Sequence, residues 1–234
     1  MNILFIMADQ LRWDHLGCSG HPYLKTPNID ALAARGVRFS NAFVNSGVCG
    51  PSRMSFYTGR YPVSHGATWN RVPLSVGEVT LGESVDLVPT VLDALGVEAP
   101  THRLEGRSLQ PLLHGSAHVP WRDFVYSELD YAYREARLLL GKDVHECRAF
   151  SLRDERWRYV YWVGEREQLF DLRADPQEFV DLGAEPGSES TRQAMQQRLL
   201  DFLARRRHRS TVTDAEVERG TAAHKRAGVF FGQW

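Results

Sequence analysis

The chain has 234 residues, a formal net charge of −1, and 43% hydrophobic and 24% charged residues. These values are ordinary for a globular protein that buries a core, and they exclude the overall basic field typical of nucleic-acid-binding proteins. No apolar run is long enough to span a bilayer, and the first residues lack the pattern of a signal peptide. We therefore expect no nucleic-acid or membrane partner and a cytoplasmic location.

Two segments in the first fifth of the chain predict buried strands. Residues 2–7 are apolar on both faces, as in a parallel sheet, and residues 37–44 alternate between apolar and polar side chains. The first segment ends at Asp9 and Gln10, and α/β proteins place their sites just past the carboxyl ends of such strands. By itself, Asp9 fits a site residue and a solvated turn about equally well.

Two helices are expected beside these strands. The first has Thr26 as its N-cap, a proline at its first position and Gly36 as its C-cap. The second is expected over residues 52–57 and ends near Gly59, with a proline in its first turn. Cys49 would then lie at a helix N-terminus, where backbone amides and the helix dipole favour negative charge.

The second half of the chain has a different character. Residues 83–95 predict an amphipathic helix in which Pro89 causes a kink or a late start. Three segments rich in aromatic and β-branched residues then predict a small antiparallel sheet: 124–126, 148–152 and 157–163. Residues 193–207 predict a terminal helix, and its arginine-rich end complements the helix dipole more simply than it marks a nucleic-acid patch.

The surroundings of Cys49 favour a chemical role for this residue. A lone cysteine more often packs as a small hydrophobic residue. Here Gly47 and Gly50 allow close approach of a ligand to the backbone, and Arg53 follows one turn later, where its guanidinium can hold an oxyanion. His65 is expected at a helix end and not as a ligand.

The other two cysteines are expected to stay unmodified. Neither Cys18 nor Cys147 is followed by the proline and arginine that follow Cys49. Three widely spaced cysteines also predict neither a disulfide framework nor a structural zinc site. His145 lies near Cys147, but two residues do not make a metal site.

The chain resembles the sulfatases of the alkaline phosphatase superfamily. Residues 49–53 read Cys-Gly-Pro-Ser-Arg and residues 58–62 read Thr-Gly-Arg-Tyr-Pro, which together are similar to the sulfatase signature. Further ordered blocks match the family at residues 2–10, 25–30, 36–39, 86–92 and 169–178. Gln10 stands where most sulfatases have a second aspartate, and with Asn70 and the long aromatic C-terminal region it resembles the phosphonate monoester hydrolase and arylsulfatase branch.

The resemblance implies an α/β fold. We expect a truncated alkaline-phosphatase-like sheet-and-helix domain over residues 1–115. A small C-terminal antiparallel sheet with a terminal helix is expected over residues 116–210, and a tail over residues 211–234.

The resemblance also implies a mechanism. A formylglycine-generating enzyme would oxidise Cys49 to formylglycine (3-oxoalanine), which hydrates to a diol. A divalent metal, calcium or manganese, would be held by Asp9, Gln10 and residue 49 and would lower the pKa of one diol hydroxyl. That hydroxyl attacks a small-molecule sulfate or phosphonate ester, and the second hydroxyl later expels the product. Arg53 would stabilise developing charge, while Asn70 and Gln10 contact substrate.

One stretch of the family pattern is missing. The gap between the signature and the late helix closes near residues 82–84, so the Asp-His-Gly block with the remaining metal ligands is absent, as are the lysine and histidine that bind the anion. The only Asp-His pair, Asp14-His15, is a poor substitute because no glycine follows it directly. Loss of central strands would also expose a sheet edge and invite pairing with another chain, for example in a homo-oligomer.

Three functions follow from these observations. The first is a formylglycine-dependent hydrolase impaired by the deletion. The second is an inactive remnant that acts at most as a binding or assembly module. The third, transfer of phosphate or phosphoglycerol groups, is disfavoured because such relatives generally use threonine or serine where this chain has Cys49.

Overall fold

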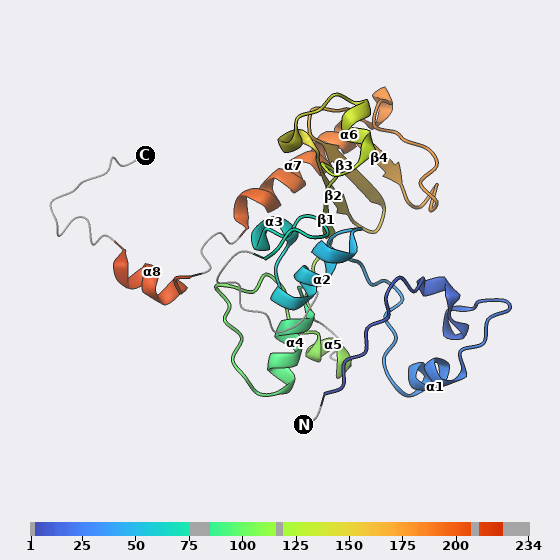
Figure 1. The fold of residues 1–234 in the computed structure, drawn as a ribbon, viewed down its shortest axis with the longest axis vertical. Helices are drawn as coiled ribbons and strands as arrows, with labels where there is room; N and C mark the ends of the chain where they lie inside the picture. The colour runs from blue at the N-terminus through green and yellow to red at the C-terminus, as the bar shows by residue number, and fades with distance from the viewer. Residues whose placement is uncertain (1–2, 75–84, 116–118, 207–210, 222–234) are drawn as a thin grey trace.

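The computed structural model of the chain describes residues 3–74, 85–115, 119–206 and 211–221 (Figure 1). The expected deletion junction near residues 82–84 lies outside the described residues. Figure 1 shows the C-terminal sheet with α6 and α7 at one end of the molecule, the helices α2 to α5 next to it, and α1 in a lobe to one side. None of the described helices is both long and apolar enough to cross a membrane.

A four-stranded antiparallel sheet forms the best-packed part of the described chain. Its strands follow the chain order: β1 (Val125–Asp130), β2 (Arg148–Arg153), β3 (Trp157–Trp162) and β4 (Gln168–Asp171). Tyr126, Leu152, Tyr159 and Leu169 lie opposite one another across the four strands, and all are fully buried. The helix α7 (Glu189–Arg205) contributes Met195 and Leu199 to the same core.

The predicted mixture of helices with a C-terminal antiparallel sheet and a terminal helix is confirmed. The strand β4 was not predicted as a strand, and α7 begins four residues earlier than its apolar pattern indicated. Short elements complete this part: α6 (Glu135–Leu139), η3 (Val144–Glu146) and η4 (Pro186–Ser188). The predicted tail contains α8 (Asp214–Gly220), whose start is fixed by a capping box between Thr213 and Glu216.

The two predicted helices next to the sheet end close to where they were expected, but their starts differ: the first begins at Cys49 and not at residue 52, and the second begins at Leu87 and not at residue 83. The helix α2 (Cys49–Thr58) ends at Gly59, which has a left-handed φ of 65°. It contacts α3 (Pro62–His65) and α4 (Leu87–Ala94), and α5 (Gln110–Leu113) packs on α4. The late start of α4 places Pro89 in its first turn, where a missing N–H costs no helical hydrogen bond.

The lobe formed by η1 (Trp13–His15), η2 (Gly17–Ser19) and α1 (Pro27–Arg35) has its own polar contacts. Thr26 occupies the N-cap of α1, as predicted, but its side chain does not bond the backbone of that helix. Its hydroxyl instead accepts a hydrogen bond from the Gly17 amide at 2.9 Å and donates one to Asp30 at 2.8 Å. Gly36 is the C-cap of α1, as predicted.

The two N-terminal strand predictions are wrong for this chain. Residues 3–7 and 37–44 belong to no strand, and their large apolar side chains are exposed. A buried strand needs neighbouring strands on its edges and covering layers on its faces. The described part of the chain provides no such neighbours, so the local pattern alone does not form a sheet.

Candidate active site

Cys49 is the first residue of α2, and its thiol is exposed. Val48 and Pro51, on either side of it, are buried and anchor the start of the helix. The hydroxyl of buried Ser46 accepts a hydrogen bond from the Val48 amide at 3.3 Å. The fold therefore presents the thiol at a fixed helix N-terminus whose amides and dipole favour an anion.

Asn70 holds the same helix end from outside the helix. Its Oδ1 accepts a hydrogen bond from the Gly50 amide at 2.7 Å, and its Nδ2 lies 3.4 Å from the Cys49 sulfur. A Cβ on Gly50 would lie 2.6 Å from Asn70 Oδ1 and 3.1 Å from its Cα, so only glycine permits this approach. Asn70 thus acts like an N-cap supplied by a distant part of the chain.

The segment that carries Asn70 is fixed to the C-terminal sheet. Thr68 donates a hydrogen bond to Asp130, at the end of β1, at 2.6 Å. Trp69 stacks on Tyr133 with ring centroids 5.6 Å apart, and the guanidinium of Arg134 lies 5.0 Å from the Trp69 ring. These contacts hold the segment that carries Asn70, and with it the start of α2, in a fixed position relative to the sheet.

Asp9 meets Arg53 one helical turn after Cys49. Their side chains form an ion pair at 2.7 Å, in which Arg53 is 37% and Asp9 74% exposed. Gln10, next to Asp9, and Arg71, next to Asn70, both have left-handed backbones with φ of 54° and 72°. Non-glycine residues adopt this conformation at a cost of roughly 1–3 kcal/mol, and such residues cluster at functional sites.

His65 is a structural residue, as expected from its place at the end of α3. It is fully buried, and its Nδ1 accepts a hydrogen bond from the Ala67 amide at 3.2 Å. The ring proton is therefore on Nε2, which donates to the hydroxyl of buried Ser55 at 3.1 Å. Burial, reinforced by the charge of Arg60, lowers the pKa of His65 to about 4. This serine–histidine pair is inaccessible to substrate.

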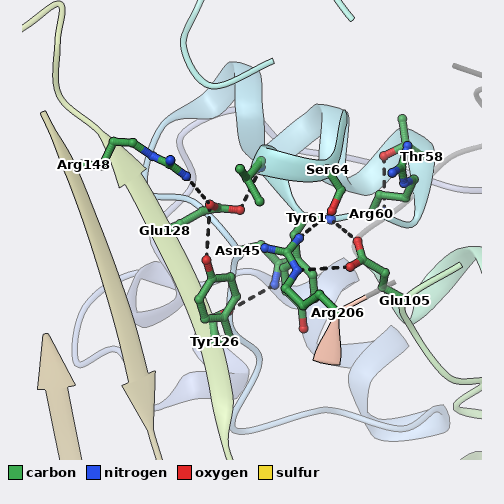
Figure 2. A network of polar contacts seen from close by, with 11 residues as sticks. Asn45, Thr58, Arg60, Tyr61, Ser64, Glu105, Tyr126, Glu128, Arg148 and Arg206 are labelled. Carbon is green, nitrogen blue, oxygen red and sulfur yellow. Dashed lines mark hydrogen bonds and ion pairs between the residues drawn. The ribbon is translucent and has the colours of Figure 1, made fainter. Parts of the chain in front are cut away.

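A buried polar network joins the signature helices to the C-terminal part (Figure 2). Glu128 on β1 accepts hydrogen bonds from the Val63 amide at 2.9 Å and from the Tyr126 hydroxyl at 3.3 Å. Burial raises the pKa of the Glu128 carboxyl. On the other side, Glu105 accepts from the Tyr61 amide at 3.0 Å and pairs with Arg206 at 3.2 Å.

The predicted metal ligands do not assemble into a cation site. Within the described residues, no group of three or more His, Cys, Asp or Glu side chains is placed to hold a metal. Asp9 is directed to Arg53, and no hydrogen bond connects Gln10 with Cys49 in the described part of the chain. A hard divalent cation takes about six oxygen ligands. The residues present therefore do not fit such an ion.

Two family models match the chain. The sulfatase model matches residues 1–102, and the model described as the C-terminal part of N-sulphoglucosamine sulphohydrolase matches residues 71–205. The chain belongs to the sulfatase family. The two matched stretches of this sulfatase-family chain overlap over the region in which the sequence places the deletion.

Known proteins show similarity over short stretches. Human arylsulfatase A is 44% identical over 88 residues, which cover 35% of this chain and 17% of that protein. The multifunctional alkaline phosphatase superfamily protein PehA of Trinickia caryophylli is 30% identical over 138 residues, 53% of this chain and 27% of that protein.

A solved structure shows the same relationship. The phosphonate monoester hydrolase of Silicibacter pomeroyi is 27% identical, has a TM-score of 0.51, and is matched over 61% of this chain and 30% of that chain. The sulfatase-family chain thus spans less than a third of these relatives, which agrees with a missing internal segment.

Two of the five predicted site residues, Asp9 and Asn70, meet α2 through contacts that the sequence did not indicate. Asp9 pairs with Arg53, and Asn70 accepts a hydrogen bond from the Gly50 amide. Asn70 was expected only as a substrate contact, yet it also caps α2 through Gly50. The tie from Thr68 to Asp130 was not predicted at all. The sequence showed only that Asn70 is a polar residue shortly after the signature. That position does not indicate that Asn70 bonds the start of α2.

Proposed function

We propose that this chain carries the nucleophile half of a formylglycine-dependent hydrolase of sulfate or phosphonate esters, with Cys49 as the modified residue. The observation that supports this most directly is the exposed Cys49 at the N-terminus of α2, capped by Asn70 and followed by Arg53. Membership of the sulfatase family supplies the class of substrate.

Formylglycine at position 49 would supply a hydrated aldehyde, with one hydroxyl to attack the ester and a second to release the product. The chain's own residues would bind and orient. The Gly50 amide is already bonded to Asn70, so the start of α2 would favour the anionic ester at position 49 through its helix dipole. Arg53 lies one turn on and would bind a sulfate or phosphonate oxygen once it leaves Asp9. Asn70 would fix the rotamer of residue 49 and contact the substrate.

We infer that hydrolysis by the chain alone is impaired. The carboxylate proposed as a metal ligand is paired with Arg53, and the described residues hold no cluster of metal donors. The proposed impairment distinguishes this chain from the longer proteins that it resembles.

The test is co-expression with a formylglycine-generating enzyme, followed by intact-mass analysis, metal analysis and assays with an aryl sulfate and a phosphonate monoester. We expect the mass loss of formylglycine formation in the wild type and in Cys147→Ala, none in Cys49→Ala, substoichiometric metal, and turnover far below that of a full-length relative. An unmodified Cys49 would refute the proposal that Cys49 is the nucleophile and would support the alternative that the chain is an inactive remnant. Full metal loading with turnover abolished by Cys49→Ala would refute the impairment.

A further inference from the structure

Two extended apolar segments lie open on the surface of this chain. Residues 3–7 contain only large apolar side chains, and residues 37–44 contain four more, with Arg38 as the sole charge in either segment. Leu4 is 84% and Ile6 77% exposed, and Val37 and Val44 are more than half exposed. Natural edge strands usually carry charges or prolines that prevent pairing, and these segments almost lack them.

Residues 3–7 already have the alternation of a strand. Ile3, Phe5 and Met7 are 40 to 49% exposed and face one side, where the Phe5 ring contacts Phe56 of α2 with centroids 4.6 Å apart. Leu4 and Ile6 face the other side and are almost fully open. One face of the segment therefore rests on the helix that carries Cys49, and the other has no cover within the described part of the chain.

The backbone of both segments is open as well. Within the described residues, no backbone hydrogen bond is made by residues 3–7 or 37–44. The first bond beyond the second segment runs from the Glu128 amide to the Asn45 carbonyl at 2.9 Å, which attaches the segment to β1 at one end only. Extended backbone with unpaired N–H and C=O groups is a template for strand addition.

We propose that residues 3–7 and 37–44 form a self-association surface through which two copies of this chain pair as a dimer. At the exposures given, the nine large apolar side chains of the two segments together expose on the order of 900 Å², and a standard interface buries roughly 800 Å² on each partner. A formal net charge of −1 leaves little repulsion between copies. A surface shared by both copies closes into a two-fold dimer without further partners.

The test is sedimentation velocity of the full chain over a range of concentrations. We expect a dimer for the wild type and for Phe179→Lys, an 85% exposed apolar residue far along the chain that serves as the matched control. We expect the dimer of the double variant Leu4→Lys and Ile6→Lys to have a dissociation constant at least about tenfold higher than that of the wild type, because its interface would bury the lysine charges. Leu4 and Ile6 are 84% and 77% exposed, so circular dichroism should show an unchanged fold.

Hydrogen exchange provides the second measurement. Amides of residues 3–7 and 37–44 should become protected as the concentration rises, while those of the C-terminal sheet stay constant. A wild type that is monomeric at all concentrations, a dimer insensitive to the lysine pair, or polydisperse aggregates in place of a dimer would each overturn the proposal. Protection elsewhere with none in these segments would overturn it as well.

Discussion

Asn70 and Gly50 are separated by 20 residues, yet the Asn70 side chain accepts a hydrogen bond from the Gly50 amide at 2.7 Å. This contact fixes the helix end that presents Cys49. The Asn70 side chain also contacts the Cys49 sulfur. The nucleophile candidate is therefore positioned by a residue outside its own motif, and the following variants test the surroundings of that position.

Replacement of Asn70 by alanine should loosen the start of α2. Loss of a capping side chain costs about 1 kcal/mol, which urea unfolding will resolve as a lower midpoint. In protein expressed without modification, the rate at which a thiol reagent labels Cys49 should change. Asn70→Asp keeps the acceptor oxygen and adds favourable charge at the helix N-terminus, so it should retain stability. Equal stability of all three proteins would show that the contact does not cap the helix.

Gly50→Ala should destabilise the chain although alanine favours helix more than glycine does. The new Cβ would lie 2.6 Å from Asn70 Oδ1 and 3.1 Å from its Cα, so Asn70 must move away. We expect a net loss of about 1 kcal/mol in urea unfolding. Gly47→Ala is the matched control because nothing lies within 4 Å of its added Cβ. A stabilised Gly50→Ala variant would contradict the proposed close approach.

The ion pair between Arg206 and Glu105 should be costly to break. Its side chains are only 9% and 6% exposed, and removal of one partner leaves a buried charge without its counter-ion. We expect Arg206→Met to lose about 3–5 kcal/mol of unfolding free energy. Arg173→Met removes a member of an exposed pair with Glu155 and should change stability by less than about 1 kcal/mol. Similar losses in the two variants would refute the structural role of the buried pair.

Stability should fall as the pH is lowered from about 6.5 to about 4. The folded chain keeps His65 neutral with a pKa of about 4, whereas the unfolded chain binds this proton near pH 6.5. The unfolded state therefore holds more protons within this window, and the contribution of His65, about 3 kcal/mol, is complete above pH 6.5 and is lost as pH falls. His65→Gln should show a smaller change in unfolding free energy over the same window. Parallel pH curves for the two proteins would rule out His65 as the source.

Local sequence signals predicted the elements that depend on local physics. The C-cap glycines of α1 and α2, the proline in α4 and the aromatic runs of β1 to β3 were each sufficient. Residues 3–7 and 37–44 have the pattern of strands but lack partners in the described chain, and a strand is completed only by its neighbours.

The sequence named residues for the candidate site, whose roles remain predictions, but it did not indicate their contacts. Cys49, Arg53 and Asp9 were identified from the signature and the first block, yet the pairing of Asp9 with Arg53 was not. Arg206 and Glu105 lie 101 residues apart, and neither belongs to a motif, so no sequence spacing indicated their contact. Long-range polar pairs of this kind depend on the way the sheet packs against the helices, which sequence patterns do not specify.

The separation of Arg206 and Glu105 along the chain has a kinetic consequence. The helix α3, which contacts α2, gains its supports from Glu128 of β1 and from Arg206 just after α7, both of which are synthesised much later. Contacts of such long sequence separation form slowly because the intervening loop must first close. The signature segment therefore leaves the ribosome well before anything can hold it in place, and its folding must wait for nearly the whole chain.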